Sequence, residues 1–168
     1  SLDRVEWVWI QDTDTHVNAL LKGEIDMIET VNYDTLPVLE KDKGVRLIKS
    51  RTSNQYVFRM NWLIPPFNNV KIRQAAMVAL SQEEFLQANI GDPRYYRVCK
   101  ALFTCDTPLA SEVGMADVLN GNAQKAREML KEAGYDGMVV VMPQPSDLQV
   151  IKQLPLVAKA QLERAGFK

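Results

Sequence analysis

The chain has only two cysteines and a single histidine among its 168 residues. Cys99 and Cys105 are too far apart for a thioredoxin-type C-x-x-C motif, and further cysteines or histidines that would complete a zinc site are lacking. The two cysteines leave two interpretations open. They form a short-loop disulfide in an oxidising compartment, or they are buried thiols in the cytosol.

An excess of charge of one sign is also lacking. The chain has 20 basic and 21 acidic residues and a formal net charge of −1. Such a balance gives no indication of nucleic acid binding. The apolar run at residues 138–142 ends at Pro143, and no apolar run approaches the ~20 residues of a membrane-spanning helix. No signal peptide precedes the first strand-like run, and we expect residues 1–168 to be a single domain excised from a larger protein.

Signatures of common enzyme classes are absent as well. The sequence contains no Walker loop, G-x-G-x-x-G, G-x-S-x-G, H-E-x-x-H or EF-hand pattern. His16 follows Asp12 and Asp14 at the start of an expected helix, but this trio lacks the spacing of a metal site and has no nearby nucleophile. We interpret His16 as an ordinary residue of a helix N-terminus. A small thiol hydrolase that uses Cys99 or Cys105 with His16 stays open as an alternative.

Helical spacing and capping signals predict much of the secondary structure. Helices are expected at residues 16–22, 33–41, 70–80, 82–89 and 123–133, and from about residue 146 to 165. Ser81 with Glu84, and Ser146 with Gln149, fit the capping box. Pro155 either kinks the last helix or begins its main part.

Alternating and β-branched runs predict strands. They are expected at residues 5–10, 25–29, 45–49, 55–60 and 138–142. Residues 51–54 are predicted to form a polar turn. Pro65 and Pro66 place residues 61–69 in a loop, and residues 92–119 show no periodicity. The pattern predicts an α/β (mixed α+β) domain with a single sheet flanked by helices.

Several segments share a family pattern in order and spacing. They are LLKGEIDM at residues 20–27, NWLIPPFNNVKIRQAAMVA at 61–79, NAQKAREMLKEAGY at 122–135 and LVAKAQLERAG at 156–166. Together they resemble the bacterial extracellular solute-binding proteins of the peptide/nickel ABC transporter class, family 5.

The resemblance implies a periplasmic-binding-protein-like (type II) fold, of which this chain would be most of one lobe. It implies a periplasmic or extracellular receptor that binds a peptide or similar small solute in a cleft between two lobes. The receptor would deliver this solute to ABC permease subunits in the membrane, without catalysis or a cofactor. A nickel or metal-chelate receptor of the same class is the alternative. The oxidising compartment favours a disulfide between Cys99 and Cys105.

Ligand contacts are expected where predicted strands end. Gln144, Ser146 and Asp147 lie between a predicted strand and a predicted helix, where backbone N–H groups favour an anionic group such as a peptide carboxylate. Ser146 acting only as a cap is the alternative. Asn61 and Trp62 follow the strand predicted at residues 55–60, and ligands of α/β sheets bind at such ends. Packing of Trp62 under the proline loop is the competing interpretation.

Overall fold

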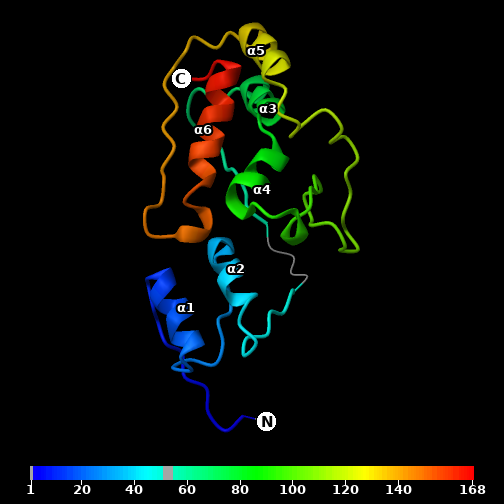
Figure 1. Ribbon diagram of the computed structural model, residues 1–168. Helices are drawn as coiled ribbons and strands as arrows, with labels where there is room; N and C mark the ends of the chain where they lie inside the picture. Colours follow the sequence, from blue (N-terminus) through cyan, green and yellow to red (C-terminus); the bar gives the residue numbers. More distant parts are fainter. Residues whose placement is uncertain (1, 51–54) are drawn as a thin grey trace. The chain divides into compact units, whose positions relative to one another are not determined.

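The computed structural model describes residues 2–50 and 55–168 (Figure 1). The chain divides into two units, Ser1–Ser50 and Arg51–Lys168. The predicted polar turn at residues 51–54 lies outside the described residues. Among the helices of the described part of the chain, none combines the length and the apolar character that a membrane span requires.

The first unit contains α1 (Thr13–Leu21), the 3-10 turn η1 (Tyr33–Thr35) and α2 (Leu36–Leu39). α1 starts at Asp12, whose carboxylate accepts a hydrogen bond from the backbone N–H of Thr15 at 2.8 Å. Just beyond its end stands Gly23 with a φ of +72°, a conformation in which glycine has no steric penalty. The helices predicted at residues 16–22 and 33–41 are confirmed, with shifted ends.

The second unit is built from α3 (Val70–Ala79), α4 (Gln82–Ile90), α5 (Ala123–Glu132) and α6 (Leu154–Ala165), with the 3-10 turns η2 (Pro93–Tyr95) and η3 (Gln149–Ile151). The side chains of Asn69, Ser81 and Asn122 cap α3, α4 and α5 by accepting backbone N–H groups. Pro155 lies in the first turn of α6, so it begins this helix and does not kink it. Ser81 thus caps α4 as predicted, but its own N–H donates to the side chain of Gln161 and not to that of Glu84, so the predicted capping box is only half formed.

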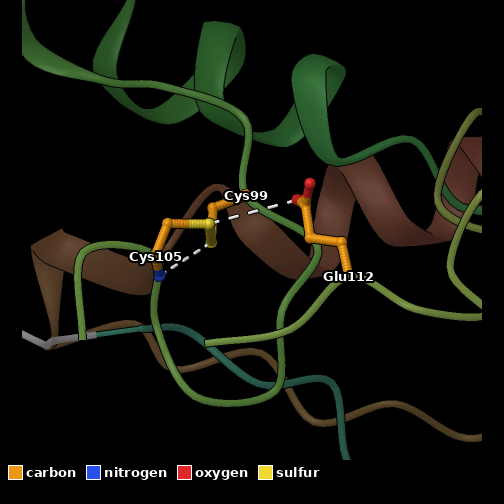
Figure 2. A group of neighbouring side chains, drawn as sticks. All are labelled: Cys99, Cys105 and Glu112. Carbon is orange, nitrogen blue, oxygen red and sulfur yellow. Dashed lines mark hydrogen bonds between the residues drawn. A yellow bond between two sulfur atoms is a disulfide. The ribbon is translucent and has the colours of Figure 1, made fainter. Parts of the chain in front are cut away.

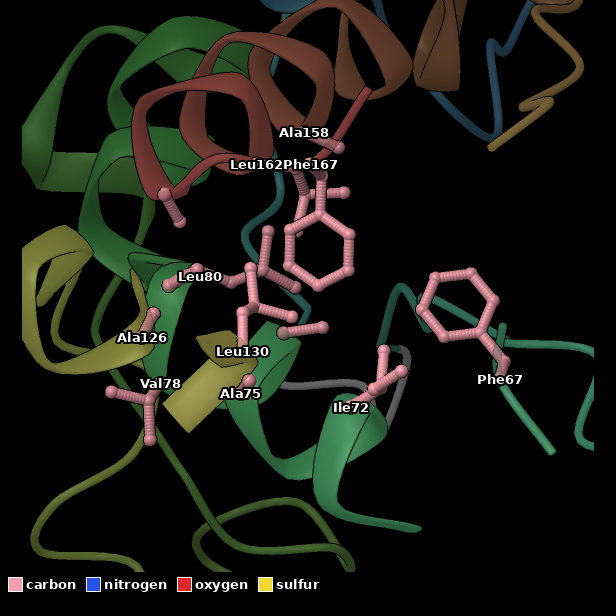
Figure 3. Packing of buried hydrophobic residues seen from close by; sticks show 13 residues of the cluster. Phe67, Ile72, Ala75, Val78, Leu80, Ala126, Leu130, Ala158, Leu162 and Phe167 are labelled. Atoms are coloured by element: carbon pink, nitrogen blue, oxygen red, sulfur yellow. The ribbon is translucent and has the colours of Figure 1, made fainter. Parts of the chain in front are cut away.

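These helices enclose one apolar core (Figure 3). α3 contacts both α5 and α6, and α4 contacts α6. Small side chains dominate the contact surfaces and are completely or almost completely buried: Ala75, Ala76, Ala126, Ala158 and Ala165. Larger residues fill the space between the helices, among them Ile72, Leu130 and Leu162. Because alanine allows helices to approach closely, these contacts remove much apolar surface from water.

Aromatic residues close one end of this core. The ring of Phe167 lies 6.1 Å from that of Phe67 and 5.4 Å from that of Tyr135, between ring centroids. Phe67 belongs to the loop before α3, which contains a cis peptide bond between Pro65 and Pro66. The loop is fixed by Arg73, which donates a hydrogen bond to the carbonyl of Phe67 at 2.6 Å. The end of the chain is thereby attached to the start of α3.

The predicted sheet is wrong. Residues 2–50 and 55–168 contain no β-strand, only an isolated antiparallel bridge between Ser81 and Asn120. The segments predicted as strands form no ladder, and several of their large apolar side chains face solvent. Trp7 and Trp9 are 82% and 90% exposed. An α/β lobe with one sheet is therefore not the architecture of the described residues, which form a helical core with extended segments.

The strand predictions are wrong because helices and strands obtain their backbone hydrogen bonds from different places. A helix satisfies its backbone groups within one segment, whereas a strand needs a neighbouring strand. Period-two alternation shows only that a segment suits a half-buried sheet. At residues 138–142 a backbone bond, from Val140 N–H to the carbonyl of Lys168 at 2.7 Å, takes the place of a ladder.

Candidate functional site

The turn that was expected to contact a ligand does not open a long helix. Gln144 donates a side-chain hydrogen bond to the carbonyl of Lys152 at 3.2 Å, which closes residues 144–152 into a loop. The next helical turn is η3, capped at Leu148 without a side-chain bond. The capping box predicted for Ser146 with Gln149 is therefore wrong, and the helix that was to attract an anion begins only at Leu154.

The polar side chains of this loop nevertheless face solvent. Gln144, Ser146 and Asp147 are all exposed. Since no helix terminus supports them, an anion here would be held by side chains and loop N–H groups alone. These residues stay candidates on the strength of their exposure and chemistry.

Asn61 and Trp62 form the second candidate group. The side chain of Asn61 accepts a hydrogen bond from Leu63 N–H at 3.1 Å, which fixes the start of the loop. Trp62 is 65% exposed, so it does not pack under the proline loop as the competing interpretation required. Within the described part of the chain, no hydrogen bond or ion pair joins Asn61 or Trp62 to the loop at Gln144. The structure shows both groups exposed to solvent.

The cysteines lie in the irregular segment between α4 and α5 (Figure 2). Cys99 and Cys105 form a disulfide with an S–S distance of 2.00 Å, the pairing that the family resemblance implied. The backbone N–H of Cys105 also donates to the sulfur of Cys99 at 3.0 Å. The chain has no other cysteine and no free thiol in this state, so a thiol hydrolase would lack its nucleophile.

The disulfide loop is held by residues that the sequence patterns did not indicate. The amide of Gln82 donates to the carbonyl of Cys99 and accepts from its N–H, both at 2.7 Å. Glu112 accepts a hydrogen bond from Lys100 N–H at 2.7 Å, and its carboxylate lies 4.0 Å from the sulfur of Cys105. No motif spacing connects these positions, because their contacts depend on how the irregular segment folds back.

Asp12, Asp14 and His16 lie at the start of α1. In the structure Asp12 is engaged as the cap of α1, where both the N–H and the hydroxyl of Thr15 donate to its carboxylate. These bonds hold the pKa of Asp12 below its ordinary value, and the bond from the Thr15 hydroxyl has a larger effect than the bond from the Thr15 N–H. In the part of the chain that the structure describes, the group of ligating side chains close enough to share an ion is Cys99, Cys105 and Glu112. Its sulfur atoms are already bonded to each other.

Comparison with known proteins shows which family the chain is similar to. A family model described as bacterial extracellular solute-binding proteins, family 5 middle, matches residues 1–168. A probable peptide ABC transporter periplasmic-binding protein of Sinorhizobium fredii is 33% identical over 169 residues, covering 98% of this chain and 32% of the relative.

Relatives from enteric bacteria are more distant. A glutathione-binding protein of Shigella flexneri is 28% identical over 178 residues, and that of Escherichia coli K12 is 26% identical over 175 residues. Each match covers 99% of this chain and 32% of the relative. The chain thus spans about a third of the length of the curated relatives it matches. Because the family model covers every residue, the chain belongs to the bacterial extracellular solute-binding proteins of family 5.

Proposed function

We propose that this chain forms one lobe of a two-lobed receptor of an ABC importer, located in the periplasm or outside the cell. The receptor binds a peptide or a peptide-like solute between its lobes and delivers it to permease subunits in the membrane. The observation that carries this proposal is the family match over all 168 residues. Relatives named for peptide and for glutathione binding support a peptide-like ligand.

The exposed candidate residues suit such a ligand. A short peptide carries a carboxylate, an ammonium group and amide groups, and these are recognised by charge-assisted and neutral hydrogen bonds. Gln144 and Ser146 offer donors for a carboxylate, Asp147 offers an acceptor for an ammonium group, and Asn61 can pair with a peptide amide. The indole of Trp62 offers an apolar surface for a side chain. We assign these residues to the wall that this lobe contributes to the cleft.

The test is native mass spectrometry of the full receptor containing this chain, purified without unfolding, with fragmentation of any bound molecule. Short peptides or glutathione would support the proposal. A metal chelate would keep the receptor but change its solute to that of the alternative, and a receptor that neither carries nor binds added peptides would contradict the peptide assignment.

Substitutions at the candidate residues test where the ligand binds on this chain. Trp62→Ala and Gln144→Ala should each weaken peptide binding by the full receptor. Gln124→Ala, an exposed glutamine on α5, serves as the matched control and should leave binding unchanged. The 168-residue chain alone should bind peptides more weakly than micromolar, because part of the cleft wall is missing and little contact remains to offset the cost of association.

A further inference from the structure

A cavity of about 310 Å³ opens within the second unit, between α3, α5 and residues 114–118. This volume is at the lower end of the range for small-molecule sites. Its lining is predominantly apolar and includes Met77, Val78, Met115, Val118 and Met129. None of the candidate peptide contacts lines it, so it is separate from the site of the proposed function.

The walls of the cavity are fixed by backbone hydrogen bonds. Leu119 N–H donates to the carbonyl of Met77 at 2.9 Å, and Asn122 N–H donates to that of Val78 at 3.0 Å. These bonds attach the segment that precedes α5 to the last turn of α3. Met115 N–H donates to the carbonyl of Glu112 at 3.0 Å, which stabilises the turn on the other side. The backbone of these walls is thus held by hydrogen bonds, which lowers the cost of ordering it when a ligand binds.

Methionine gives this cavity an adaptable surface. Three of the chain's seven methionines, Met77, Met115 and Met129, line it, and each is partly buried. Met129 and Val118 also pack against the core. Unbranched thioether side chains adjust to ligands of different shape and offer polarisable contacts. This lining suits a flexible aliphatic chain better than a rigid polar molecule.

The lining of the same cavity includes a partly exposed cation. Lys125 lines it, and its ammonium group is 3.6 Å from the carboxylate of Asp117, beyond hydrogen-bond length. The Asp117 side chain is 81% exposed, so this ion pair is weak and a second carboxylate can replace it. Gln74 also lines the cavity and adds an amide donor to its lining.

We propose that this cavity is a second binding site, which takes a small amphiphile with an unbranched apolar chain and a single carboxylate. The apolar chain lies among Met77, Met115 and Met129, and the carboxylate binds Lys125. Charge complementarity with Lys125 selects a carboxylate over a neutral or cationic head group.

Methyl NMR of the full chain labelled at methionine methyl groups tests this proposal, with octanoate as the probe. We expect saturable shifts at Met77, Met115 and Met129, while Met27, Met60, Met138 and Met142 act as internal references. Octanol and octylamine should bind more weakly. Shifts spread evenly over all seven methionines, or absence of saturation, would overturn the site. Equal binding of octanol and octanoate would overturn the carboxylate assignment.

A pair of charge variants separates the role of Lys125 from a general charge effect. Lys125→Gln should raise the dissociation constant for octanoate about two- to fivefold, the size expected for one partly exposed ion pair. Lys131→Gln removes the same charge from the same helix at a position outside the cavity lining and should leave binding unchanged. The reference methyl groups show whether each variant is folded. Equal effects of the two substitutions would contradict the proposal.

Discussion

The side-chain amide of Gln161 forms hydrogen bonds with both backbone polar groups of Ser81. It accepts from Ser81 N–H at 2.8 Å and donates to the Ser81 carbonyl at 3.4 Å. The same amide donates to Glu84 at 3.1 Å, and Glu84 also accepts from Arg164 at 2.5 Å. Gln161 is only 1% exposed. α6 is thereby fixed to the start of α4 by a polar contact inside an apolar core.

Replacement of Gln161 by leucine should lower the free energy of unfolding by about 1–3 kcal/mol, because the buried N–H of Ser81 loses its partner. Urea unfolding followed by circular dichroism measures this change. Gln153→Leu, at the exposed start of the same helix, is the control and should change stability by less than about 0.5 kcal/mol. Equal midpoints for the two variants would mean that the Gln161 contact contributes nothing.

The contribution of the α5 cap to the free energy of unfolding should be measurable by substitution of one residue. The side chain of Asn122 accepts a hydrogen bond from Lys125 N–H at 3.0 Å. Asn122→Ala should therefore cost about 1 kcal/mol, whereas Asn122→Ser retains a capping oxygen and should cost much less. Chemical unfolding of the two variants beside the unaltered chain provides the comparison. Similar losses for alanine and serine would show that the side-chain bond is not the cause.

The disulfide between Cys99 and Cys105 predicts a simple mass change. The intact mass of the denatured chain should rise by that of about two hydrogens on reduction. Alkylation should modify neither cysteine before reduction and both afterwards. Modification of both residues without a reductant would contradict the disulfide.

Protonation of Asp12 at low pH should reduce the stability of α1. Hydrogen bonds from Thr15 lower the pKa of this carboxyl from its ordinary 3.8. The cap therefore stabilises α1 fully above that ordinary value, and its contribution is lost as the pH falls through the lowered, folded-state pKa. A carboxyl NMR titration should give a midpoint for Asp12 below 3.8. Thr15→Val removes the hydroxyl bond and should move the midpoint upwards, and an unchanged midpoint would assign the shift to another cause.

Sequence patterns predicted helices well because the determinants of a helix are local. Asn122 and Ser81 cap helices from positions adjacent to them, and Gly166 adopts a φ of +101° directly after α6. Ser146 carried the same kind of signal, yet the chain there is held by the Gln144 contact to Lys152 instead. A capping pattern therefore does not by itself decide between a helix and a closed loop.

Contacts between distant residues were beyond the reach of such patterns. The bonds of Gln82 to Cys99 span 17 positions, and those of Gln161 to Ser81 span 80. Neither has a periodic signal, because the geometry depends on the packing of the whole second unit. The strand predictions were wrong for a related reason, since alternation describes one segment while a ladder requires two. The pairing of the cysteines came from the family resemblance and not from their spacing.

The exposure of the tryptophans has an optical consequence. The chain's three tryptophans, Trp7, Trp9 and Trp62, are all largely exposed, so the emission of the isolated chain should be red-shifted and readily quenched by acrylamide. In a variant with Trp7 and Trp9 replaced by phenylalanine, Trp62 becomes the sole indole and lies at a candidate ligand position. A blue shift of its emission on addition of a solute would then report in real time that this patch has been covered.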